Sequence, residues 1–174
     1  GNRIGWSLAD PAGALGNSWG GIAVVDSANT QIGSTAAGEV NRISGNGGAG
    51  IDLYGPLATQ AEVIGNYIGT IDPAGSWIAK PNGVGILVQA GAHGNLIGGS
   101  TTSRRNVIAG NRFNGILANF NAPVTIRGNR IGVGTNGTTA MPNGLDGIRV
   151  ESGTAQIGGT ISSDLNVVSA NTGN

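Results

Sequence analysis

The stretch Gly65-Asn66-Tyr67-Ile68-Gly69 decides the fold, because its pattern occurs three times in the chain. It occurs earlier as Gly1-Asn2-Arg3-Ile4-Gly5 and later as Gly128-Asn129-Arg130-Ile131-Gly132, at offsets of 64 (65 − 1) and 63 (128 − 65) residues. Self-similarity at a fixed period is typical of stacked repeat architectures. We therefore predict one continuous domain over residues 1–174. Its super-repeats are 1–64, 65–127 and the incomplete 128–174.

A Gly-Ile-x-Val segment follows a loop in each super-repeat, at 21–24, 85–88 and 147–150. Residues two apart in a strand share a face, so the Ile and the Val are expected to point inward and the variable residue outward. Gly and Asn bound these short segments, as is typical of strands joined by tight turns. No apolar pattern at helical spacing lasts two turns, so no significant helix is expected.

The sequence thus predicts an all-β chain, a single parallel β-helix with two coils of three short strands in each super-repeat. Three shorter coils in each super-repeat is the alternative. Stacked Ile and Val side chains are expected to fill the interior. The predicted core is Ile4, Ile22, Val24, Ile32, Ile43, Ile51, Ile68, Ile86, Val88, Ile97, Ile108, Ile116, Ile131, Ile148, Val150 and Ile157.

Asparagine recurs at four positions of the repeat. Gly and Asn accept the left-handed backbone conformation that sharp turns need. An Asn that recurs at one position along the coil can also donate a hydrogen bond to one neighbour and accept one from the other. We expect four structural columns: Asn2/Asn66/Asn129, Asn17/Asn82/Asn143, Asn41/Asn106/Asn166 and Asn46/Asn111/Asn171.

The pattern resembles glycine- and asparagine-rich right-handed parallel β-helix repeats, which are pectate-lyase-like β-solenoids of large bacterial secreted or surface proteins. The closest matches are residues 65–70 and 105–111, and the resemblance covers the whole chain. It implies a right-handed coil and a location outside the cell or on its surface. It says little about activity, because this fold carries lyases, hydrolases, adhesins and phage fibres.

The composition excludes several classes of protein. Glycine makes up 34 of 174 residues but does not recur every third position, so collagen is excluded. Zero net charge argues against nucleic-acid partners. The sequence contains no run of about 18 apolar residues, so membrane insertion is not expected. Cysteine is absent, so there is no disulfide or thiolate metal site. We expect no cofactor.

Asp52 is the one candidate metal ligand. Residues 47–54 fit the nonapeptide calcium pattern of β-helices, but that motif works in tandem, and Leu117 stands at the equivalent position of the next copy. We therefore expect an outward Asp52 without a metal. The nine acidic residues are scattered, although Asp52 and Glu62 lie close enough in sequence to meet within one coil, and His93 is the only histidine. The chain is thus not predicted to be an enzyme.

A candidate binding face carries Arg3, Tyr67, Arg130, Trp6 and Trp77, since aromatic rings and arginines on a flat rod suit sugars or a partner rod. The alternative is that the tryptophans cover the ends of the core. Ice binding is not favoured, because no ladder of outward threonines recurs.

These observations predict a mechanical function: a stalk, fibre, or matrix or surface filament. Both chain ends fall inside a repeat and no polar cap is visible. We therefore expect either that the chain is part of a longer repeat protein or that its ends stack on neighbouring copies. The expected partner is the protein itself, in end-to-end or lateral association. Polysaccharide is the second candidate partner. The alternative functions are a carbohydrate-binding adhesin, and a polysaccharide lyase or hydrolase with its site outside this segment or on its loops.

Overall fold

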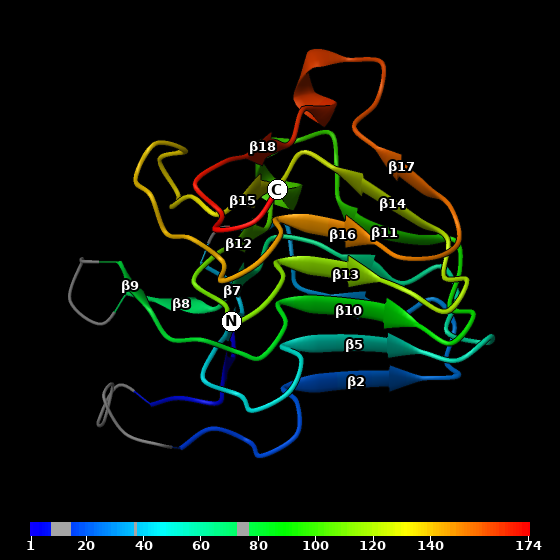
Figure 1. The fold of residues 1–174 in the computed structure, drawn as a ribbon, viewed down its shortest axis with the longest axis horizontal. Coiled ribbons are helices and arrows are strands. Elements are labelled where there is room, and N and C mark those ends of the chain that lie inside the picture. The colour runs from blue at the N-terminus through cyan, green and yellow to red at the C-terminus, as the bar shows by residue number, and fades with distance from the viewer. Residues whose placement is uncertain (8–14, 37, 73–76) are drawn as a thin grey trace.

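The computed structural model describes residues 1–7, 15–36, 38–72 and 77–174. It is an all-β parallel β-solenoid with three parallel sheets wound around one core (Figure 1). Each full turn contributes one strand to each sheet. This confirms the predicted parallel β-helix architecture.

The strands of each sheet stack in chain order. Sheet A consists of β1 (Arg3–Ile4), β4 (Arg42–Ile43), β7 (Tyr67–Ile68), β12 (Val107–Ile108), β15 (Arg130–Ile131) and β18 (Val167–Val168). Sheet B consists of β2 (Ile22–Val25), β5 (Ile51–Tyr54), β10 (Ile86–Gln89), β13 (Ile116–Ala118) and β16 (Ile148–Val150). Sheet C consists of β3 (Gln31–Ile32), β6 (Glu62–Val63), β11 (Asn95–Gly98), β14 (Val124–Arg127) and β17 (Ala155–Ile157).

The described residues contain no α-helix, as the sequence predicted. In this part of the chain, only two single turns of 3-10 helix occur, η1 (Thr102–Arg104) and η2 (Ser162–Asp164), both in the connection from sheet C to sheet A. One turn of the solenoid spans roughly half of the sequence offset between the Gly-Asn-x-Ile-Gly copies, as the paired positions Ile51, Ile86 and Ile116 show. The alternative of three shorter coils over that offset is therefore wrong.

The core lies between the three sheets, and the inward side chains of equivalent strands stack on one another. Eleven of the sixteen predicted core residues are buried, and Ile4, Ile22 and Ile148 are partly buried against them. Val150 and Ile157 are corrections, because they are 38% and 53% exposed. They lie in β16 and β17, on which no further turn of the described chain stacks.

Loop segments cover part of the outer face of sheet A. The antiparallel hairpin of β8 (Thr70–Ile71) and β9 (Ile78–Ala79) extends from the third turn, at the left of Figure 1. Val107 has its expected outward position, yet it is only 3% exposed because it clusters with Ala109 and Met141. Tyr67 and Trp77 pack against the same small cluster. Sheet A is thus apolar on both faces at this point.

Candidate functional site

Two ladders of asparagine run along the axis of the solenoid, at the two corners that flank sheet A. The first ladder is Asn2, Asn41, Asn66, Asn106, Asn129 and Asn166. The second ladder is Asn17, Asn46, Asn82, Asn111, Asn143 and Asn171. In both, each Nδ2 donates to the Oδ1 of the next asparagine at 2.8–3.1 Å.

The ladders confirm the predicted stacking of asparagines but correct its arrangement. The four expected columns combine in pairs. The offset between the sequence copies covers about two turns of the solenoid, so each expected column contains the asparagines of every second turn only. Asn41 therefore lies between Asn2 and Asn66, and Asn46 lies between Asn17 and Asn82. Each ladder includes asparagines from every turn of the described chain.

The interior rungs satisfy several polar groups at once. Asn106 Nδ2 donates both to Asn129 Oδ1 at 2.9 Å and to the backbone carbonyl of Val63 at 2.7 Å. Its backbone N–H also donates to Asn129 Oδ1, at 3.3 Å. Asn106 is fully buried, and buried polar groups are stabilising only when they are paired in this way. The ladders therefore fix the two corners that flank sheet A, where the backbone leaves the sheet pairing.

The second ladder explains why a glycine precedes every isoleucine at the start of a sheet B strand. A Cβ atom on Gly85 would lie 2.4 Å from the carbonyl oxygen of Gly115 and 2.9 Å from Nδ2 of Asn111. It would also lie 2.7 Å from Cγ2 of Ile108. Close approach to a ladder amide is shared by all five equivalent glycines, Gly21, Gly50, Gly85, Gly115 and Gly147. The Gly-Ile motif is thus a packing requirement of the ladder.

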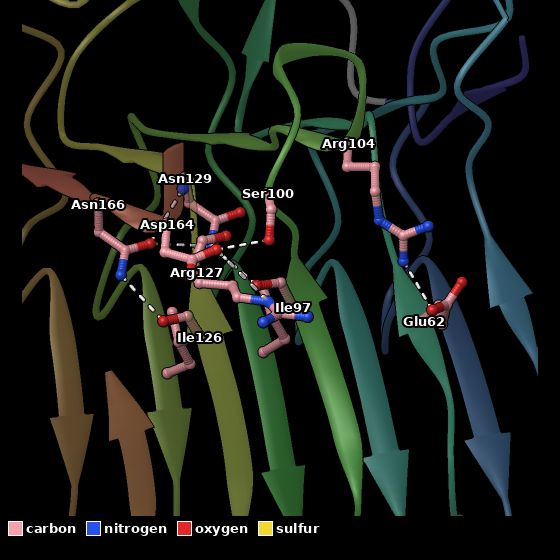
Figure 2. Close-up of polar contacts among 9 residues, drawn as sticks. All are labelled: Glu62, Ile97, Ser100, Arg104, Ile126, Arg127, Asn129, Asp164 and Asn166. Atoms are coloured by element: carbon pink, nitrogen blue, oxygen red, sulfur yellow. Dashed lines mark hydrogen bonds and ion pairs between the residues drawn. The ribbon is translucent and has the colours of Figure 1, made fainter. Parts of the chain in front are cut away.

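A group of charged and hydroxyl side chains follows the corner between sheets C and A, shown in Figure 2. We call it the charged edge: Glu62, Ser100, Arg104, Arg127 and Asp164. Arg104 Nη2 pairs with Glu62 Oε1 at 2.6 Å. Ser100 Oγ donates to Asp164 Oδ1 at 2.5 Å, and Arg127 Nε lies 3.9 Å from the same oxygen. The Arg104–Glu62 and Arg127–Asp164 contacts join neighbouring turns, and the Ser100–Asp164 hydrogen bond joins residues two turns apart.

The charged edge was not predicted from the sequence. A signal was present, because a charged residue stands two positions before the first-ladder asparagine in each long connection: Glu39, Arg104 and Asp164. Asp164 is 4% exposed, with a hydroxyl and a guanidinium beside it. A single carboxylate with these neighbours has the composition of a structural tie.

The five residues of the predicted binding face all lie on or beside the outer face of sheet A. The Arg3 guanidinium lies 5.5 Å from the Trp6 ring, and Trp6 is only 5% exposed. Tyr67 and Trp77 pack edge to face, with ring centroids 4.8 Å apart, and Arg130 is half-buried. Trp6 thus contacts Arg3, and Tyr67 contacts both Trp77 and Arg42. Use of this face by a ligand stays a prediction, and the buried Trp6 offers no open ring to it.

Asp52 occupies an outward position of β5 and is half-buried. Its two carboxylate oxygens each accept a hydrogen bond from Gln89 Nε2, at 3.1 Å. Burial raises the pKa of the Asp52 carboxyl, and the Gln89 hydrogen bond opposes that shift. Leu87 and Leu117 follow Asp52 in register on the next two strands, so no carboxylate continues the column. Among the described residues, no three His, Cys, Asp or Glu side chains gather at one place.

Glu62, Asp146 and His93 each have a separate local partner. Glu62, which the sequence placed near Asp52, pairs with Arg104 instead. Asp146 accepts from Arg149, and its pKa is lowered mainly by the hydrogen bond from the backbone of Asn174. His93 is exposed, with Nδ1 3.0 Å from the Gly91 carbonyl oxygen.

Comparisons with known proteins identify no relative. No protein family model matches the chain, and searches of curated proteins and of solved structures also gave no match. Within the described ranges, no helix is long and apolar enough to cross a membrane. The resemblance to bacterial β-helix repeats consequently rests on sequence motifs, while the solenoid architecture rests on the strand pairing.

Proposed function

We propose that this protein is a structural rod, a right-handed parallel β-helix that serves outside the cell or on its surface as a stalk, fibre or matrix filament. The observation that carries the proposal is that both asparagine ladders and all three parallel sheets run in the same direction along one axis. Right-handedness is supported by the strong preference of parallel crossover connections for that hand.

A super-repeat of two turns is part of this proposal. The first residues of successive sheet A strands are Arg3, Arg42, Tyr67, Val107, Arg130 and Val167. The intervals between them are 39 (42 − 3), 25 (67 − 42), 40 (107 − 67), 23 (130 − 107) and 37 (167 − 130). Long and short turns therefore alternate, and one of each makes up a super-repeat.

The ladders give the rod a polarity, which supports ordered end-to-end growth. Every rung donates toward the later turn and accepts from the earlier one, as Asn82, Asn111 and Asn143 illustrate. An added turn, whether from this chain or from another copy, continues both ladders only in one orientation. Association of copies with themselves is therefore proposed to be head-to-tail, with lateral contact as the other mode.

Electron microscopy of the purified protein tests this proposal. Strands of neighbouring turns lie about 4.8 Å apart, so the five stacked strands of sheet B make a rod on the order of 25 Å long. Filaments many times longer, with a continuous axial repeat of about 4.8 Å in diffraction, are expected. Discrete short particles at all concentrations would refute self-assembly and favour a carbohydrate-binding adhesin module or a segment of a polysaccharide-processing enzyme.

A further inference from the structure

An open groove lies on the outer face of sheet B beside Trp19. It encloses about 500 Å³ between the Trp19 side chain and the strands β2, β5 and β10. Trp19 is 89% exposed, which makes it the most exposed large apolar side chain in the described residues. Such an exposed indole ring is available for contact with a ligand.

The floor of the groove is one column of outward positions in register. Ala23 in β2, Asp52 in β5 and Leu87 in β10 are direct neighbours across the sheet. The carboxylate thus lies between two apolar side chains. Glycines at positions 20, 21 and 48 line the remaining wall, and because they have no side chains the space in front of Asp52 stays open.

The Asp52 carboxylate has no compensating charge of its own. None of the ion pairs among the described residues includes it, and its hydrogen-bond partner, Gln89, is neutral. The same column reaches a cation only at Arg149, beyond Leu117, and that guanidinium already pairs with Asp146 and Glu151. A half-buried carboxylate without a cation carries an unfavourable desolvation energy, in agreement with its raised pKa.

An exposed indole ring beside a half-buried carboxylate favours one ligand chemistry over two others. An organic cation pairs with a carboxylate and is attracted to the face of a tryptophan ring. A neutral sugar would stack on Trp19 but would leave the charge on Asp52 uncompensated. A metal ion needs several oxygen ligands, and this groove contains one carboxylate.

We propose that the groove between Trp19 and Asp52 binds an organic ammonium group, carried either by an alkylammonium compound or by the protonated amino sugar of a polysaccharide. The ammonium group pairs with the Asp52 carboxylate and contacts the indole of Trp19. The carbon body of the ligand lies against Ala23, Ala49 and Leu87. This inference is independent of whether the rod assembles into filaments.

Isothermal titration calorimetry with three probes tests the site: glucosamine, glucose and tetramethylammonium. Glucosamine and glucose are a matched pair that differs by one ammonium group. We expect glucosamine to bind at least tenfold more tightly than glucose. Tetramethylammonium binding more tightly than glucosamine identifies the alkylammonium source, and the reverse order identifies the amino sugar.

Variants locate the binding on the protein. Asp52→Asn is isosteric and is expected to weaken cation binding at least tenfold, and Trp19→Ala severalfold. Glu151→Gln is the matched control, because it removes one negative charge just beyond β16 of the same sheet without touching the groove. Circular dichroism confirms that each variant is folded. Equal affinity for glucose and glucosamine, absence of cation binding, or equal effects of Asp52→Asn and Glu151→Gln would each overturn the proposal.

Discussion

The most direct perturbation of the ladders is Asn111→Asp, which keeps the shape of the side chain and removes its two amide hydrogens. In the native protein, Asn111 Nδ2 donates to Asn143 Oδ1 at 2.9 Å and to the Ile68 carbonyl oxygen at 3.3 Å. Its Oδ1 accepts from Asn82 at 3.0 Å. The substitution therefore places an acceptor against two acceptors in a position that is 2% exposed.

The expected cost follows from the protonation of the introduced carboxyl. Protonating an aspartate of ordinary pKa at pH 7 costs about 4 kcal/mol, at about 1.4 kcal/mol for each of roughly three pH units. The protonated form restores one donated hydrogen bond and loses the other, which is worth about 1 kcal/mol. We expect Asn111→Asp to lower the free energy of unfolding by about 3–5 kcal/mol at pH 7 and by about 1 kcal/mol near pH 4.

The sign of this pH dependence is specific. The folded state raises the pKa of the introduced carboxyl, so the destabilisation is present above that pKa and decreases as the pH falls through it. Urea denaturation followed by circular dichroism at both pH values measures the effect. Asn29→Asp is the control, since Asn29 is an exposed residue between β2 and β3 and belongs to neither ladder. Equal, small losses of stability for the two variants at pH 7 would refute the structural role of the ladder.

Three further outcomes are expected. Gly85→Ala should destabilise the protein by more than about 2 kcal/mol, because the added Cβ would lie 2.4 Å from a backbone oxygen. Gly134→Ala is the control and should change stability little, because its added Cβ has its nearest neighbour at 3.5 Å. Similar thermal unfolding temperatures for the two variants would contradict the packing argument. Burial raises the pKa of Asp52, so the ionised carboxylate destabilises the folded protein above that pKa. Asp52→Asn should therefore be more stable than the native protein at pH 7, and the difference in unfolding free energy should shrink as the pH falls. A difference that grows on acidification would disprove this. A double-mutant cycle on Glu62 and Arg104 should give a coupling energy below about 1 kcal/mol that weakens with added salt, since the two side chains are 39% and 26% exposed. A salt-independent coupling energy of several kcal/mol would show that the pair is effectively buried.

The sequence predicted those features of the fold that depend on local pattern. Alternation around Ile86 and Val88 indicated a strand with one buried face, and the structure has β10 there with both side chains buried. The recurring asparagines indicated stacked rungs, which the ladders confirm. Handedness and the function outside the cell remain predictions, because they depend on the resemblance and not on the pairing of particular residues.

Other features depended on long-range packing that no local pattern encodes. Val107 reads as an outward strand residue, yet Met141, from the loop that follows β15 one turn later, covers it. The charged edge forms between residues that are far apart in the sequence. Arg104 and Glu62 are separated by 42 positions, and Ser100 and Asp164 by 64 positions. The groove at Trp19 likewise requires knowing which strands lie beside the turn that carries it.

The alternation of long and short turns has a geometric consequence for the outer wall of the rod. Long turns recur at every second level, so their loops are separated by about 9.6 Å along the axis, close to the ~10 Å that separates two sheets packed face to face. Each long-turn loop therefore has room at its own level, as the hairpin of β8 and β9 has where it extends from the third turn (Figure 1), and the short turn beneath it serves as a spacer. Lengthening a long turn changes only the surface relief at its own level. Lengthening a short turn would bring three loops into the space of two and would disturb the winding itself.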